Sequence, residues 1–308
     1  MNPLTFRKAN LTYFLFFLYF IAGSVGISVL NPSMNLYVLL NELILVAPPV
    51  IFFTWKYKRK QSIQSFLRLN PIGWKTALVS MIIPIVMYPV IAGLNACVIS
   101  MLPSMPKTFD NVNLMQQLNF CIGLLGVGIL PGILEEAMFR GILIRGMQHK
   151  SKRFAIVYIA FLFGMFHMNP YNFVAPFLLG ILLGYLLYTT NSIIPGMIAH
   201  ATNNTIAVIG VALLGNVQKP TQSTPMPSSM PPSVIVFAVI MVLLLFAFSI
   251  WVTRFLFKKL KKWNPQPLIE YEVIEEEKEK RKNRWSYLYV SVPFVCYFLS
   301  ILFLTKLT

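Results

Sequence analysis

Acidic residues are scarce in this chain. Its 308 residues include 10 Asp and Glu against 26 Lys and Arg, and charged residues make up only 12%. A soluble domain typically carries about 25% charged residues. Apolar residues account for 56% of the chain, and they gather in long runs separated by short basic clusters. This pattern excludes a single soluble globular domain and predicts a protein with several membrane spans.

Cysteine is also rare, and its placement excludes a disulfide scaffold or a cysteine-rich zinc cluster. Cys97, Cys121 and Cys296 each lie inside an apolar run, where packed free thiols are expected. A clear small-residue cleavage site is lacking after the first apolar run, which follows Arg7 and Lys8. That run is therefore predicted to be a retained first helix and not a signal peptide.

The net charge of +16 suggests a nucleic-acid partner at first sight, but its distribution argues against one. The basic residues flank apolar runs, where such residues anchor helices at a membrane surface. They do not form a single stripe interleaved with exposed aromatic residues. We therefore expect a lipid bilayer, and no nucleic acid, as the partner of this charge.

The apolar runs predict an all-α fold, a polytopic transmembrane helix bundle with about nine spans. The fifth run is the shortest, since a span needs about 20 residues. The candidate spans cover residues 11–30, 36–54, 76–100, 114–137, 154–168, 172–189, 192–214, 232–253 and 286–305.

Charge bias predicts the orientation of these spans. With the N-terminus in the cytoplasm and the spans alternating, only Lys107, Lys219 and Lys306 of the 26 basic residues fall on the outside. This agreement with the positive-inside rule supports both the number of spans and the cytoplasmic N-terminus. The segment 215–231, rich in Pro, Ser and Thr, is predicted to be an external loop.

The few acidic residues divide into two groups. Six lie within residues 270–279 and Asp110 lies in a predicted external loop, which leaves Glu42, Glu135 and Glu136 inside apolar spans. A charged side chain at the centre of a span costs about 2.5–3.5 kcal/mol or more, so such residues indicate function. Glu42 has no partner that the sequence identifies.

The segment PGILEEAMFRG places two glutamates near the end of the fourth span. Glu136 and Arg140 are at i and i+4 and can pair on a helix, whereas Glu135 is rotated about 100° away from Glu136. The preceding Pro131 and Gly132 can loosen the helix and admit water. A salt bridge at a helix end explains Glu136 and Arg140 without any function, but it explains Glu135 less well.

Two histidines lie in neighbouring spans with polar or aromatic companions at helical spacing. His167 follows Phe163 at i+4, and Asn204 follows His200 at i+4. A lone histidine in a span usually packs through hydrogen bonds, but two of them together with a glutamate pair favour a functional site. Since His167 lies near the end of a short span, it reaches Glu135 only if that span is tilted or displaced inward.

The motifs EEAMFR (Glu135 to Arg140), FGMFH (Phe163 to His167) and HATNN (His200 to Asn204) resemble, in order, the three motifs of the CAAX-processing and bacteriocin-processing intramembrane proteases. That family includes type II CAAX prenyl endopeptidases and Abi-type immunity proteins. The resemblance covers roughly residues 114–212 and implies an eight-helix protease core plus one extra C-terminal helix. The predicted units are 1–113 (N-terminal spans), 114–214 (catalytic core), 215–253 (external loop and span), 254–285 (charged cytoplasmic segment) and 286–308 (C-terminal span).

The resemblance also implies a mechanism. Glu135 and His167 would activate a water molecule, and His200 and Asn204 would donate hydrogen bonds to the oxyanion. Supporting roles would fall to Glu136, Arg140 and Phe163. No cofactor is required in this scheme.

An alternative within the same family is a metalloprotease. Zinc would then be held by Glu135, His167 and His200 with one open position. The chain has no H-E-x-x-H helix, and the three candidate ligands lie on different spans, which favours metal-independent activation of water.

Other functions stay open at this point. A catalytically silent scaffold or bacteriocin-immunity protein of the same fold would keep the motifs without turnover, and a transporter could use the buried Glu and His residues as a proton relay. Transporters often contain repeated halves, and this chain has none. The expected partner is a peptide or protein substrate: a prenylated CAAX protein, a bacteriocin leader or a pheromone precursor. The expected location is a bacterial plasma membrane, and no oligomeric state follows from the sequence.

Overall fold

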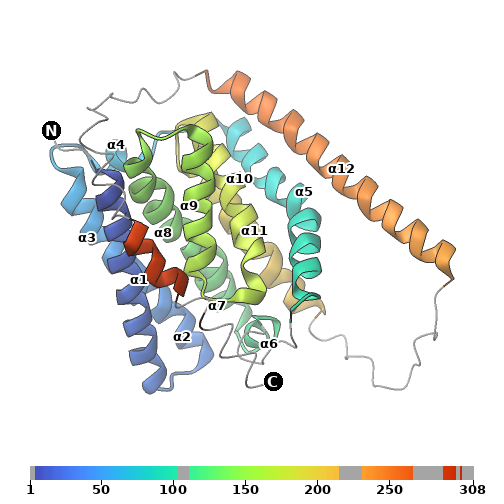
Figure 1. Cartoon of the computed structure of the whole chain (residues 1–308), viewed down its shortest axis with the longest axis horizontal. Helices are drawn as coiled ribbons and strands as arrows, with labels where there is room; N and C mark the ends of the chain where they lie inside the picture. Colours follow the sequence, from blue (N-terminus) through green and yellow to red (C-terminus); the bar gives the residue numbers. More distant parts are fainter. Residues whose placement is uncertain (1–3, 103–110, 215–230, 266–286, 296–298, 300–308) are drawn as a thin grey trace.

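The computed structural model describes residues 4–102, 111–214, 231–265, 287–295 and 299. Every regular element within these residues is a helix (Figure 1). Among them, six helices are long and apolar enough to cross a membrane: Phe6–Val29, Met34–Lys58, Trp74–Ile99, Phe120–Met147, Ile194–Leu213 and Pro232–Trp263. A further apolar helix, Val174–Thr190, is shorter than these six. The predicted all-α polytopic bundle is therefore confirmed.

Several spans consist of more than one helical element. The N-terminal elements are α1 (Phe6–Val29), α2 (Met34–Leu40), η1 (Asn41–Val46), α3 (Ala47–Lys58), α4 (Ile63–Leu67) and α5 (Trp74–Ile99). The central elements are α6 (Asn111–Met115), α7 (Phe120–Gly123), η3 (Leu124–Ile129), α8 (Leu130–Glu136), η4 (Ala137–Ile142) and η5 (Leu143–Met147). The remaining elements are α9 (Lys152–Phe166), η6 (Pro170–Asn172), α10 (Val174–Thr190), α11 (Ile194–Leu214) and α12 (Pro232–Trp263).

Two helices run further than their apolar runs predicted. The fourth span continues to Met147 because Arg140 and Arg145 bond to groups within the bundle, so their charges do not end the helix. Helix α12 continues to Trp263, with Leu260 buried and the lysines around it exposed. The first ten residues of the predicted charged segment 254–285 are thus helical.

The fifth predicted span is a short helix, and several other predicted segments lie partly or wholly outside the described residues. The fifth predicted span, 154–168, corresponds to α9, a helix of 15 residues. Of the ninth predicted span, 286–305, the structure describes 287–295 and 299, where Tyr287 contacts Phe6 of α1. The external loop 215–230, the segment 266–286 and Cys296 lie outside the described residues.

The core of the bundle is an aromatic cluster that joins α1, η4 and α9. Phe16 stacks on Phe166 with ring centroids 4.6 Å apart, and Phe139 meets Phe163 edge-on at 5.1 Å. Phe16, Phe139 and Phe163 have no exposed surface. Helix α11 packs against α8, helix α10 packs against α9, and α12 lies at the periphery beside α5 (Figure 1).

Prolines release backbone carbonyls at two irregular places in the bundle. Helices α3 and α8 each have proline at their second position, Pro48 and Pro131, and each follows a π-helical segment, η1 or η3. Because proline has no N–H, Pro48 cannot bond the carbonyl of Ile44, and that carbonyl instead accepts from the Tyr19 hydroxyl at 2.8 Å. In the same way, Pro131 leaves the carbonyl of Val127 available to another side chain. Such π-helical segments are frequent at functional sites.

Gly132 lets α8 approach α11 closely. A Cβ atom at Gly132 would lie 2.8 Å from the backbone nitrogen of Ala201 and 3.0 Å from its Cβ. The site described below lies on these two helices, so their spacing determines which side chains can meet. By contrast, a Cβ atom at Gly210, further along α11, would have no other atom within 4 Å.

We predict opposite effects for alanine at these two glycines. Gly132→Ala should lower stability by about 1–3 kcal/mol, since overpacking forces two backbones apart. Gly210→Ala should be neutral or stabilise the chain by up to about 1 kcal/mol, the usual gain of alanine over glycine within a helix. Thermal unfolding of the full chain in detergent measures both. Equal stability of the two variants would contradict the close helix contact.

Candidate active site

Two adjacent glutamates at the end of α8 are enclosed by the bundle. Glu135 is 7% exposed and Glu136 is fully buried. The next segment, η4, is π-helical, so the helix is irregular on both sides of the pair. In an apolar interior each carboxylate needs a partner, because an unpaired buried charge is costly.

Arg140 is the partner of Glu136. Its Nη1 atom donates to Oε1 of Glu136 at 2.7 Å, which confirms the pairing expected from their i, i+4 spacing. Its Nη2 atom donates to the carbonyl of Gly180 on α10 at 3.0 Å. The guanidinium also lies over the Phe163 ring, 4.7 Å from its centroid. Arg140 is thereby held by three elements, and its charge neutralises Glu136 more directly than Glu135.

His200 on α11 lies between the two carboxylates. Its Nδ1 atom lies 3.3 Å from Oε1 of Glu136, and its Nε2 atom lies 3.8 Å from Oε2 of Glu135. The imidazole is 2% exposed. With Nδ1 donating to Glu136, the neutral ring presents Nε2 toward Glu135 as an acceptor. Glu136 therefore orients the ring, and the opposite nitrogen is available to a proton at Glu135.

Phe163 connects the second histidine to this group. His167 and His200 both meet its ring edge-on, with centroids 4.9 and 5.5 Å away. His167 lies just past the end of α9, and its Nδ1–H donates to the Phe163 carbonyl at 2.9 Å. Because a carbonyl only accepts, this bond assigns the proton of a neutral His167 to Nδ1 and leaves Nε2 free to accept. Among the described residues, no direct bond joins His167 to Glu135.

Asn204 lies one turn beyond His200 on α11. Its Nδ2 atom donates to the Val127 carbonyl at 3.0 Å, the carbonyl that Pro131 leaves without an α-helical partner. Its Oδ1 atom accepts from Asn203 at 3.2 Å. The side-chain amide is thus fixed in orientation by the irregular backbone of the fourth span, and its second N–H remains for another acceptor.

The structure thus brings most of the predicted residues together. His200 contacts both glutamates, Glu136 pairs with Arg140, and His167 joins them through Phe163. Asn204 is on the same helix as His200, but its hydrogen bonds go to Val127 and Asn203. Two parts of this arrangement were not expected from the sequence: the Gly180 carbonyl that holds Arg140, and the buried Glu42 on a segment, η1, that packs against α8. A carbonyl contact has no sequence signal, but an acidic residue within an apolar span was a signal for Glu42.

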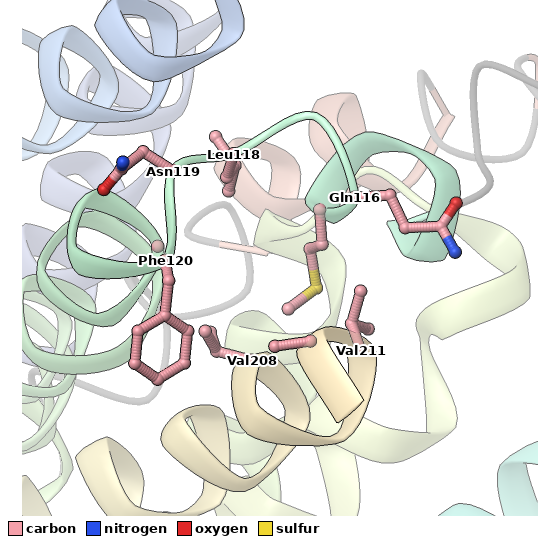
Figure 2. Close-up of a pocket in the computed structure, with 9 residues that line it drawn as sticks. Gln116, Leu118, Asn119, Phe120, Val208 and Val211 are labelled. Carbon is pink, nitrogen blue, oxygen red and sulfur yellow. The ribbon is translucent and has the colours of Figure 1, made fainter. Parts of the chain in front are cut away.

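A pocket of about 330 Å³ opens beyond the Asn204 end of this group. Figure 2 shows Val208 and Val211 of α11 on one side of it and Leu118 and Asn119 on the other. The pocket contains none of the glutamates or histidines, and it begins one helical turn past Asn204. It is lined by Met115, Gln116, Leu118, Asn119, Phe120, Gly123, Val208, Val211 and Ala212.

The zinc alternative was tested against the positions of its candidate ligands. Within the described part of the chain, no group of three His, Cys, Asp or Glu side chains is arranged to hold a metal ion. Structural and catalytic zinc sites need at least three protein ligands around one point. Glu135, His167 and His200 do not meet this requirement, so no step of the chemistry below passes through a metal.

The fold and this group of residues define a class: an α-helical integral membrane protein with a buried Glu, His and Asn site among its spans. Residues 117–206 match the family model described as type II CAAX prenyl endopeptidase Rce1-like. The matched residues contain the three motifs, so the match supports the family that these motifs resemble. No curated protein and no solved structure matches the chain.

We predict that Arg140 is required for folding because it neutralises a fully buried carboxylate. Arg140→Met should lower stability by about 3–5 kcal/mol, the usual cost of leaving one partner of a buried ion pair. The double variant Glu136→Gln with Arg140→Met should recover part of the loss, since it removes the unpaired charge. Thermal unfolding and expression level measure both effects.

Arg145→Met is the matched control for this experiment. Arg145 lies on the same span and bonds only to the backbone carbonyls of Phe66 and Ser65. Its loss leaves no buried carboxylate behind, so the decrease in stability should be smaller. A double variant as unstable as Arg140→Met alone would contradict the role of Arg140 as a counter-charge.

Proposed function

We propose that this chain is an intramembrane endopeptidase that hydrolyses a peptide bond with a water molecule activated by Glu135. The observation that carries the proposal is the buried group in which Arg140 neutralises Glu136, Glu136 orients His200, and Glu135 keeps an oxygen without a hydrogen-bond partner. A base with an unengaged oxygen beside an oriented imidazole is suited to take a proton from water. The family match supports a protease of this general type.

The proposed chemistry needs only groups of this chain. Glu135 takes a proton from water, and the hydroxide forms a bond to the scissile carbonyl carbon. The second N–H of Asn204 donates to the carbonyl oxygen and stabilises the negative charge that develops there. The proton on Glu135 then passes to the leaving amine, the carbon–nitrogen bond breaks, and the carboxylate is restored. His167 supports this cycle with its free Nε2 atom.

The substrate is proposed to be a membrane-associated peptide, including peptides with a prenylated CAAX end or a bacteriocin-type leader. The pocket beside Asn204 supports this, since its walls combine apolar side chains with the amides of Gln116 and Asn119. A peptide segment can pack its side chains there while its backbone bonds to the amides. We also propose that the protein lies in a bacterial plasma membrane with its N-terminus in the cytoplasm, as the charge bias indicates.

The test of the proposed function is hydrolysis of an internally quenched prenylated CAAX peptide by the purified full chain in liposomes. Glu135→Gln keeps the size of the side chain and removes the base, so the rate should fall by at least about 100-fold. His200→Ala should also lower the rate strongly, because the neighbour of Glu135 is lost. Thr253→Val serves as a control, since it removes a buried hydroxyl on α12, away from the site.

Hydrolysis by the Glu135→Gln variant at the wild-type rate would refute the proposed function. The same assay with the unprenylated peptide separates substrate classes within it. A family member that binds without turnover would show peptide binding by the wild type and no cleavage of either peptide.

Removal of metal ions is a separate prediction. Because the candidate ligands do not meet around one point, activity should survive prolonged treatment with EDTA or 1,10-phenanthroline. Metal content of the purified protein, measured by mass spectrometry, should not correlate with the rate. Loss of activity with chelator that returns on adding zinc would instead support the metalloprotease alternative.

A further inference from the structure

All three acidic residues in the described part of the chain lie around the same site. Glu42 comes from the second span, whereas Glu135 and Glu136 come from the fourth, and all three are buried. The segment that carries Glu42, η1, packs against α8, which carries Glu135 and Glu136. Three separate residues of this rare type therefore converge inside the bundle, although only two of them belong to the family motifs.

The fold delivers Glu42 to this place through an irregular stretch of helix. Glu42 lies in η1, the π-helical segment that precedes the prolines of α3, and η1 packs against α8. Its side chain is 4% exposed. A π-helical turn holds one more residue than an α-turn, so it changes the direction in which the following side chains point. A buried carboxyl group on a π-helical turn that packs against α8 indicates a functional role more strongly than a single polar residue within a regular span does.

The hydrogen bonding of Glu42 leaves half of its carboxyl group unused. Oε1 accepts from the Asn41 side chain at 3.1 Å, whereas Oε2 is buried and has no hydrogen-bond partner. A purely structural carboxyl group would be expected to have both oxygens satisfied, since an unpaired buried polar atom is costly. Glu42 shares this feature with Glu135 and Glu136, whose Oε2 atoms are also buried and unpartnered.

We propose that Glu42 is a positioning residue for the hydrolytic reaction and acts through its charge on Glu135. The inference rests on the proposed function. The described charged and titratable groups around Glu135 are Glu136 and Arg140 on its own span and His200 on α11, with His167 reached through Phe163. Since Arg140 pairs with Glu136 at 2.7 Å, Glu42 and Glu135 are the two carboxyl groups in the described part of the chain that have no close arginine or lysine partner.

The consequence for the reaction follows from simple electrostatics. Like charges repel strongly in an interior of low dielectric constant, and the repulsion is relieved when one of them takes up a proton. In the proposed mechanism Glu135 takes up a proton from water in the first step. Glu42 therefore stabilises the state in which Glu135 carries that proton more than the starting state, which lowers the barrier of this step.

Three variants of Glu42 test this role with the same prenylated peptide in liposomes. Glu42→Gln keeps the shape and the Asn41 bond but removes the charge, so kcat should fall by about tenfold with KM unchanged. Glu42→Asp shortens the side chain but keeps the charge, so it should retain more activity than Glu42→Gln. Glu42→Ala should resemble Glu42→Gln in kcat if the protein folds.

Thr54→Val is the matched control. Thr54 lies on α3, the later part of the same span, and its buried hydroxyl also has no hydrogen-bond partner. Twelve residues of helix, or about 18 Å, separate it from Glu42. This variant removes a buried polar group from the span without touching the site, so kcat should stay at the wild-type value.

The outcomes separate this inference from the proposed function. Wild-type kcat in Glu42→Gln, or a greater loss in Glu42→Asp than in Glu42→Gln, would overturn the charge-based role and leave a packing role. An inactive Glu135→Gln with an unaffected Glu42→Gln would refute only the inference about Glu42. An active Glu135→Gln would refute the proposed function itself. Thermal unfolding of each variant shows whether a loss of rate reflects a loss of fold.

Discussion

The ion pair between Glu136 and Arg140 is the interaction on which the rest of the site depends. An unpaired charge inside an apolar bundle costs several kcal/mol, so each partner requires the other. Arg140 also bonds to the Gly180 carbonyl on α10 and lies over Phe163 on α9, while Glu136 contacts His200 on α11. One pair of opposite charges therefore ties four helices together, and it leaves the neighbouring Glu135 without a close counter-charge.

Irregular helix geometry is concentrated where the polar residues meet. Segments η3 and η4 flank the glutamate pair, and η1 carries Glu42. By contrast, α12 is an uninterrupted α-helix of 32 residues at the edge of the bundle. Proline contributes to this difference: Pro131 cannot bond the Val127 carbonyl, and Asn204 uses that carbonyl to fix its own amide. The backbone of the fourth span thus takes part in orienting a side chain on α11.

Much of the fold and part of the site could be predicted from the sequence because they depend on local properties. Apolar runs long enough for a bilayer predicted the helices, and the i, i+4 spacing predicted the pairing of Glu136 with Arg140. Expected helix ends were wrong where charged residues find partners inside the bundle, as Arg140 and Arg145 do. The catalytic roles of Glu135, His167, His200 and Asn204 stay predictions, and the one polar contact among these four side chains joins His200 to Glu135.

By itself, the sequence determined that this chain forms apolar helices, that three of its rare acidic residues lie within them, and that its central motifs resemble those of the CAAX-type proteases. Hydropathy, charge and short spacing carry this information because they act between residues that are close along the chain. Only the tertiary structure decided that the segment carrying Glu42 packs against α8, that His200 contacts both glutamates, and that His167 joins them through Phe163. These contacts depend on the packing of helices distant in the sequence and on the wider π-helical turns, which no local pattern encodes.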